Sequence, residues 1–268
     1  MAALALKLVL TPLLIGGATL VARRWGPLVG GWIIALPLTS GPILFFLALD
    51  HGPAFASVAA VGSLAGLAAI AAFCLGYAFV ARRAGRSEPA RDGWFAPGLG
   101  VAGASLAFAV AAVALQPLVA ISIWLVLLVV LVAVTIAARL IPRSGELHPP
   151  IEHPWWDLPG RMVVATTLVV GLTAVAPLLG PGWSGLVATF PVYLSVMAAF
   201  AHRHAGPAAA DDVLRGMLAG LYGTAAFYVV LNLALLPLGI ATAFFAAIPT
   251  ALVIDAATLR AVRVVEGI

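Results

Sequence analysis

Nine apolar stretches, most of them about 20 residues long, follow one another along this sequence with short connections between them. A helix needs about 20 apolar residues to cross the roughly 30 Å hydrocarbon core of a bilayer. Only 9% of the residues are charged, against about 25% in soluble domains, so the bilayer must be the solvent. The sequence therefore predicts an all-α, polytopic membrane protein with about nine transmembrane helices. The stretches lie near residues 3–22, 29–49, 54–81, 96–115, 119–140, 162–179, 184–202, 210–236 and 239–259.

Basic residues gather in every second connection between these stretches. Arg23, Arg82 and Arg143 follow the first, third and fifth stretches, whereas the connections after the even-numbered stretches contain no Lys or Arg. Cytoplasmic loops of membrane proteins are enriched in Lys and Arg. We therefore expect a bacterial inner-membrane protein with its amino terminus outside and its carboxyl terminus in the cytoplasm. The net charge of +4 comes from such loop residues, which indicates contacts with the lipid bilayer and not with nucleic acid.

The two halves of the chain resemble each other at a fixed offset of 154 residues. Residues 31–73 align with 185–227 without a gap, and 15 of the 43 pairs are identical. The pairing of Gly52-Pro53 with Gly206-Pro207 is the most specific, because Gly and Pro are less interchangeable than Ala and Leu. Four stretches plus one linker make five crossings, so the second copy must run in the opposite direction. The sequence predicts two inverted four-helix repeats, residues 1–117 and 161–268, joined at 118–160 by a linker transmembrane helix and a cytoplasmic loop.

The second and seventh stretches carry helix-breaking residues at matching positions in the two repeats. Inverted repeats with interrupted helices are the common plan of secondary transporters, whose substrates bind at the interruptions. Proline kinks that serve packing alone are the alternative. The candidate substrate-binding residues are Pro37, Thr39, Ser40 and Gly41 in the first repeat and Pro191, Tyr193 and Ser195 in the second.

Polar residues near the ends of the stretches are candidates for gating or coupling, although solvated helix ends would have the same composition. Asp255 is interpreted as an interfacial partner of Arg260, one turn later, with a proton-coupling carboxylate as the alternative. The remaining candidates are Asp50, His51, His202, His204, Asp212 and Arg215.

No motif for enzyme chemistry is present in the sequence. Phosphate-binding glycine loops, catalytic Ser-His-Asp signatures and zinc-ligand spacings are absent, and the single cysteine, Cys74, is expected to be a small core residue. The polar segment 146–157 contains His and carboxylate side chains, but its prolines and paired tryptophans favour a linker anchored at the headgroups over a metal site. We expect no enzyme activity, no cofactor and no metal.

The second repeat resembles the GlpM-like family of small bacterial inner-membrane proteins over roughly residues 161–258. The resemblance rests on Gly185-Leu186, Phe190-Pro191, Gly206 and the run Asp212-Val213-Leu214-Arg215. Family members look like a single four-helix unit, so this chain resembles a fused, inverted pair. The first repeat has 57–61 in place of the acidic-Leu-Arg element, so any role of Arg215 would belong to one half. The resemblance implies a membrane role connected with exopolysaccharide production.

Two functions follow from these features as expectations. The first is a transporter, or a flippase for a lipid-linked intermediate, that acts on a small neutral or amphipathic substrate between the two repeats. The second is a non-transporting scaffold or accessory protein with a partner in envelope polysaccharide biosynthesis. No sequence feature specifies an oligomeric state.

Overall fold

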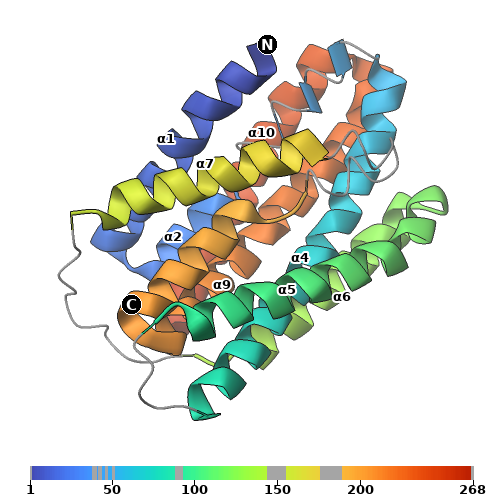
Figure 1. Cartoon of the computed structure of the whole chain (residues 1–268). Coiled ribbons are helices and arrows are strands. Elements are labelled where there is room, and N and C mark those ends of the chain that lie inside the picture. Colours follow the sequence, from blue (N-terminus) through green and yellow to red (C-terminus); the bar gives the residue numbers. More distant parts are fainter. Residues whose placement is uncertain are drawn as a thin grey trace.

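The structure, a computed structural model, describes residues 2–37, 41, 44–45, 48–49, 52–87, 93–143, 155–175 and 189–266. Within these residues every regular element is a helix and no strand is present, which confirms the all-α fold class. The elements shown in Figure 1 are α1 (Ala2–Trp25), α2 (Pro27–Ala35), α4 (Pro53–Ser87), α5 (Phe95–Leu115), the 3-10 helix η1 (Gln116–Ala120), α6 (Ile123–Leu140), α7 (Asp157–Val175), α9 (Val192–Leu238) and α10 (Ile240–Glu266).

Five helical segments in the described residues are long and apolar enough to cross a membrane. Large apolar side chains on these segments face outward; Leu106 is 66% exposed and Phe245 is 83% exposed. Such a surface is stable when lipid tails surround it, so the chain is an all-helical membrane protein. The five segments are Pro53–Arg83, Phe95–Ala120, Ile123–Leu140, Val192–Leu238 and Ile240–Ala261.

The observed helices match the nine expected stretches only in part. The second stretch begins as α2, but this helix is nine residues long and ends at Ala35. The seventh and eighth stretches are joined in the 47-residue helix α9, which bends at Gly206, where φ is 82° and ψ is 179°. We call residues 192–205 the first arm of α9 and residues 207–238 its second arm.

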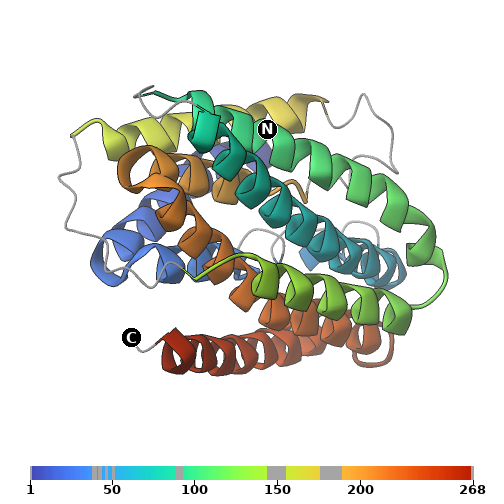
Figure 2. The ribbon, with the colours of Figure 1, turned by 90° about the horizontal axis from the view of Figure 1, so that it is seen from below.

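Helix α9 lies at the centre of the arrangement. It packs against α2, α4, α6 and α10, while α5 packs on α4 and α1 packs on α7. Figure 1 shows α1 and α7 together at one side of the molecule, and Figure 2 shows α10 along one edge with the carboxyl terminus beside it. Leu64, Phe73 and Tyr77 of α4 and Leu218 of α9 are fully buried in the core. Cys74 is buried among them, as expected.

Helix α2 and the second arm of α9 touch through their backbones. A Cβ atom built on Gly216 would lie 1.8 Å from the carbonyl oxygen of Leu28, and one built on Gly31 would lie 2.0 Å from that of Val213. A Cβ on Gly220 would lie 2.5 Å from the Cβ of Ala35. Without side chains between them, the two helices gain close van der Waals contact, which is the main source of helix association in lipid.

Three sharp reversals share one local design, a glycine with positive φ followed by a proline. The φ values are 90° at Gly26, 86° at Gly52 and 82° at Gly206. Only glycine adopts such a φ without steric cost, and the proline that follows is suited to the first residue of the next helix. The equal geometry at Gly52 and Gly206 agrees with the fixed offset between the two halves of the sequence.

Candidate functional site

The carboxylate of Asp255 lies at the contact between α2, α9 and α10. Its side chain is fully buried, and Oδ1 accepts a hydrogen bond of 3.1 Å from the backbone N–H of Gly223. Within the described part of the chain, Oδ2 has no hydrogen-bond partner. A Cβ built on Gly223 would lie 2.2 Å from Cγ of Asp255, so only a glycine leaves room for the carboxylate. The indole Nε1 of Trp32 donates to the backbone carbonyl of Asp255 at 3.2 Å and joins α2 to α10.

Helix α2 ends beside this carboxylate. Leu36 leaves the helix with φ −56° and ψ 144°, the extended conformation that a following proline favours. The carbonyl of Ala35 accepts a hydrogen bond of 2.5 Å from Oγ1 of Thr224, which directly follows Gly223 in α9. A side chain of α9 therefore satisfies a carbonyl at the interrupted end of α2.

The structure describes two of the four candidate residues in the second stretch. Pro37 is half-buried after the end of α2, and a Cβ on Gly41 would lie 3.4 Å from the ring of Phe227. Thr39 and Ser40 lie outside the described residues, as do Asp50 and His51.

The candidate residues of the seventh stretch lie at the start of α9. Pro191 precedes the helix, Tyr193 is half-buried, and Ser195 is buried with its hydroxyl donating to the carbonyl of Pro191 at 2.9 Å. A Cβ built on Gly66 of α4 would lie 3.0 Å from Oγ1 of Thr189, so the segment before Pro191 rests on α4. The hydroxyl of Ser195 is thus engaged within its own helix.

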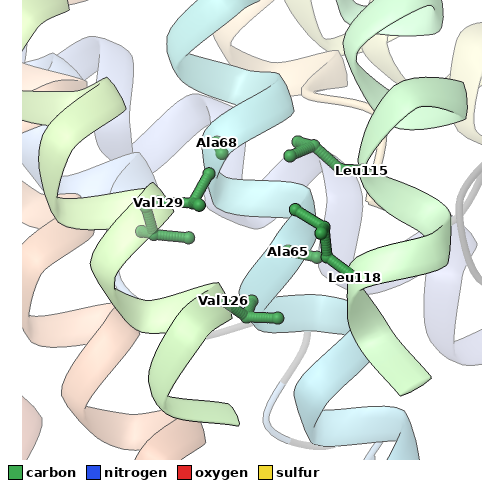
Figure 3. A pocket seen from close by; sticks show the side chains of 7 residues that line it. Ala65, Ala68, Leu115, Leu118, Val126 and Val129 are labelled. Atoms are coloured by element: carbon green, nitrogen blue, oxygen red, sulfur yellow. The ribbon is translucent and has the colours of Figure 1, made fainter. Parts of the chain in front are cut away.

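Two hollows in the described structure have apolar walls. The first, shown in Figure 3, has Leu115 and Leu118 on one side, Val126 and Val129 on the other, and Ala65 and Ala68 between them. The second has a volume of about 310 Å³ and lies between α6, α9 and α10, where Leu127, Tyr222 and Ile254 are among its lining residues. Neither of these two hollows is lined by a candidate site residue.

A buried charge cluster joins α1, α7 and the first arm of α9. The fully buried Asp157 is bonded by Arg23 at 2.7 Å, by Arg161 at 3.2 Å and by His204 at 2.8 Å. The guanidinium of Arg161 also lies 4.8 Å from the ring centre of Phe200. Burial alone would raise the pKa of Asp157, but the neighbouring Arg161, Arg23 and His204 hold that pKa below its ordinary value. Burial lowers the pKa of Arg161.

Residues on both sides of the bend at Gly206 bond to other helices. A ring nitrogen of His202 lies 3.3 Å from the hydroxyl of Tyr77, and Asp211 forms an ion pair with Arg82. Arg215 donates to the carbonyl of Ile141 at 3.1 Å, at the carboxyl end of α6, where cations are stabilised by the helix dipole. Asp212 is half-buried in the next turn after the bend. The candidates His202, His204 and Arg215 therefore tie the bend in α9 to α4, α7 and α6.

The expected pairing of Asp255 with Arg260 is wrong. The Asp255 side chain is fully buried, whereas Arg260 is exposed. Positions five apart on a helix are about 140° apart around its axis, so the two side chains lie on different faces. An ion pair on one face needs a spacing of three or four residues.

Sequence reasoning missed Asp157 and Arg161 as functional candidates. Asp157 ends the polar segment 146–157 and Arg161 begins the second repeat, yet the two lie four residues apart at the start of α7, where a carboxylate is favoured. That spacing was visible in the sequence, but the contribution of Arg23, which is 134 residues away from Asp157, was not. The segment 144–154, including most of the polar loop, lies outside the described residues.

The described residues thus form a helical membrane protein in which a buried carboxylate without a basic partner, Asp255, is connected to an interrupted helix, and a separate charge cluster lies near a helix bend. No family model, curated protein or solved structure matches the chain. The resemblance to the GlpM-like family therefore stays a prediction, and the function must be argued from the geometry.

Proposed function

We propose that the protein is a small secondary transporter, or a flippase for a lipid-linked intermediate, that moves a neutral or amphipathic substrate across a bacterial inner membrane. The observation that carries the proposal is the end of α2 at Ala35, which adjacent residues of α9 connect to a buried carboxylate: Thr224 bonds the Ala35 carbonyl and Gly223 bonds Asp255. Interrupted helices are tolerated inside a membrane bundle where protein surrounds them or where they line a cavity, because their free backbone groups need polar partners. In secondary transporters, paired interrupted helices form the substrate site.

Two glycine contacts support the arrangement as inverted repeats. Gly66 and Gly220 are 154 residues apart, and so are Ala35 and Thr189. A Cβ on Gly220 would meet Ala35, and a Cβ on Gly66 would meet Thr189. The interrupted segment of each half thus packs against a glycine of the other half, as expected for halves related by a twofold axis. A site between the halves is the usual position in transporters with this symmetry.

The length of α9 supports a larger number of crossings than five. A straight helix of this length would extend for about 70 Å, twice the thickness of a hydrocarbon core. With the bend at Gly206, the second arm accounts for the eighth stretch, and the first arm accounts for the later part of the seventh. α1, with 24 residues, and α7, with 19 residues, are long enough to cross as well.

The contacts around Gly206 and Asp157 are suited to a closed gate on the cytoplasmic side. They join α1, α4, α6, α7 and α9 at the ends where the basic residues gather. Alternating access would require His204 to separate from Asp157 and His202 from Tyr77. Under this proposal, His202, His204, Asp212 and Arg215 act in gating at the cytoplasmic end.

The second candidate function is a non-transporting membrane scaffold or an accessory of envelope polysaccharide assembly. The apolar walls of the two hollows and the backbone contact between α2 and α9 favour it. A scaffold needs dry, close packing and no path for a substrate.

Cysteine accessibility in intact cells distinguishes the two functions. In a Cys74→Ala background, single substitutions Pro37→Cys, Gly41→Cys, Tyr193→Cys and Ser195→Cys would be treated with a charged, water-soluble thiol reagent. Transport predicts labelling of the first pair from outside and of the second pair after access from the cytoplasm. Phe245→Cys, on an exposed apolar surface expected to face lipid, is the control that should stay unlabelled. Protection of all four site positions in correctly inserted protein would leave the scaffold as the function.

A further inference from the structure

Among the buried acidic side chains of the described chain, Asp255 is the one without a basic partner. Asp157 has Arg23, Arg161 and His204, and Asp211 has Arg82. The carboxylate of Asp255 has one donor, the N–H of Gly223 at 3.1 Å, and its Oδ2 has no partner within those residues.

Among the described side chains, the titratable groups closest to Asp255 along the neighbouring helices bond elsewhere or are exposed. Helix α2 contains no titratable residue. On α9, the hydroxyl of Tyr222 lies 2.9 Å from that of Thr135, Arg215 bonds the end of α6, and the ring of Tyr228 packs on Phe227. On α10, Arg260 is exposed.

A charged carboxylate in this position would be costly. An ion within a membrane bundle is stable when a counter-charge or water solvates it, whereas the neutral acid needs far less polar contact. The single N–H of Gly223 satisfies Oδ1. When Oδ2 is protonated, no charge lies at the contact between α2, α9 and α10. The packed arrangement of these three helices therefore favours the protonated acid.

The same carboxylate is connected to the interrupted helix. The backbone N–H of Gly223 donates a hydrogen bond to Oδ1. The hydroxyl of the next residue, Thr224, donates one to the carbonyl of Ala35 at the end of α2. The indole N–H of Trp32 in α2 donates a hydrogen bond to the backbone carbonyl of Asp255. Loss of the proton would place a charge between α2, α9 and α10 and favour entry of water there. A change at Asp255 is therefore transmitted directly to the end of α2.

From this geometry we propose that Asp255 is a proton-binding site, and that proton release from its carboxyl group opens the contact between α2, α9 and α10. The coupling ion of the transporter is then the proton. The role in coupling rests on the proposed function, whereas the binding of a proton does not.

Infrared difference spectroscopy of the full-length protein in lipid vesicles tests the proposal. Spectra would be compared between about pH 5, where an exposed Asp is ionised, and about pH 9. We expect the carbonyl band of a protonated carboxyl group at the lower pH, a smaller band at the higher pH, and loss of the band in Asp255→Asn. Incorporation of aspartate labelled with ¹³C in its side-chain carboxyl should shift the band in the unmodified sequence, so assignment to Asp does not depend on folding of the variant.

Each alternative result has a definite meaning. Absence of the band at the lower pH means that Asp255 is ionised, and a band of equal size at both pH values means a permanently neutral structural acid; either outcome overturns the proposal. A band that persists in a folded Asp255→Asn protein would place the proton elsewhere. If the band titrates but the cysteine positions are all protected, Asp255 binds a proton in a protein that does not transport. If those positions are labelled and the band is absent, transport stands without this proton site.

Discussion

The single carboxylate of Asp157 is surrounded by two arginines and a histidine. Arg23, Arg161 and His204 come from three different helices and converge on a carboxylate that is fully buried. Isolated surface ion pairs contribute little to stability, but a buried charge that loses its only partner is strongly unfavourable. Because Arg161 is buried as well, it depends on Asp157 for its counter-charge.

Asp157→Asn should destabilise the protein by about 3–5 kcal/mol near neutral pH, because the amide leaves Arg161 buried without a counter-charge. The pKa of Asp157 is lowered in the folded protein, so the carboxylate contributes its full stabilisation above the ordinary pKa of about 3.9. This contribution is lost as the pH falls through the lowered pKa. Thermal unfolding followed by tryptophan fluorescence should show a difference between the two proteins that shrinks only below about pH 4. A difference that grows on acidification would contradict this account.

The features that the sequence predicted correctly are the local ones. The end of α2 before Pro37 and the reversals at Gly52 and Gly206 follow from glycine and proline chemistry, which acts within a few residues. The contact between Arg23 and Asp157 depends on how α1 and α7 pack, which no local pattern contains. The isolation of Asp255 from Arg260 could have been predicted, because a spacing of five residues separates two side chains on a helix.

Helices α2 and α9 pack closely because glycines lie at their contact, where larger side chains would keep the two backbones apart. Gly31, Gly216 and Gly220 allow backbone atoms of the two helices to touch. The contacts at Gly31 and Gly216 tolerate no added atom, because the nearest groups are backbone carbonyls that cannot move as a flexible side chain can.

Gly216→Ala and Gly62→Ala form a matched pair of variants, since the two glycines are 154 residues apart and both lie within helices. A Cβ at Gly216 would be 1.8 Å from the carbonyl oxygen of Leu28, whereas a Cβ at Gly62 meets nothing within 4 Å. Gly216→Ala should cost at least about 1–3 kcal/mol through overpacking. Gly62→Ala should be neutral or stabilising by up to about 1 kcal/mol, because alanine favours helix. Equal thermal stabilities of the two variants would show that the close contact is unimportant.

The distribution of charge over the molecule predicts the orientation of the protein in the membrane. The exposed apolar surfaces of α5, α6 and α10 are suited to lipid, and the ion pairs and arginine contacts of Arg23, Arg82, Arg161 and Arg215 gather at helix ends. The connections after the even-numbered apolar stretches lack basic residues. Cytoplasmic enrichment of Lys and Arg predicts the amino terminus outside and the carboxyl terminus inside.

Two exposed positions test this orientation. Ile121, between η1 and α6, is 65% exposed and should lie outside, while Trp155, before α7, is 88% exposed and should lie in the cytoplasm. In the Cys74→Ala background, a membrane-impermeant maleimide should label Ile121→Cys in intact cells and Trp155→Cys only after the membrane is opened. The opposite pattern would reverse the orientation of every helix, and labelling of both in intact cells would contradict the odd number of crossings between them.

The backbone contact between α2 and α9 also has a consequence for synthesis on the ribosome. Gly31 meets Val213, which is made about 180 residues later. At about 5–20 residues per second, α2 would enter the membrane roughly 10–35 s before its partner exists. During that interval its glycine face and the carbonyls at its interrupted end must be covered by lipid, by the insertion machinery or by a temporary neighbour. The final partner of α2 is therefore available only after the bend in α9 has been synthesised.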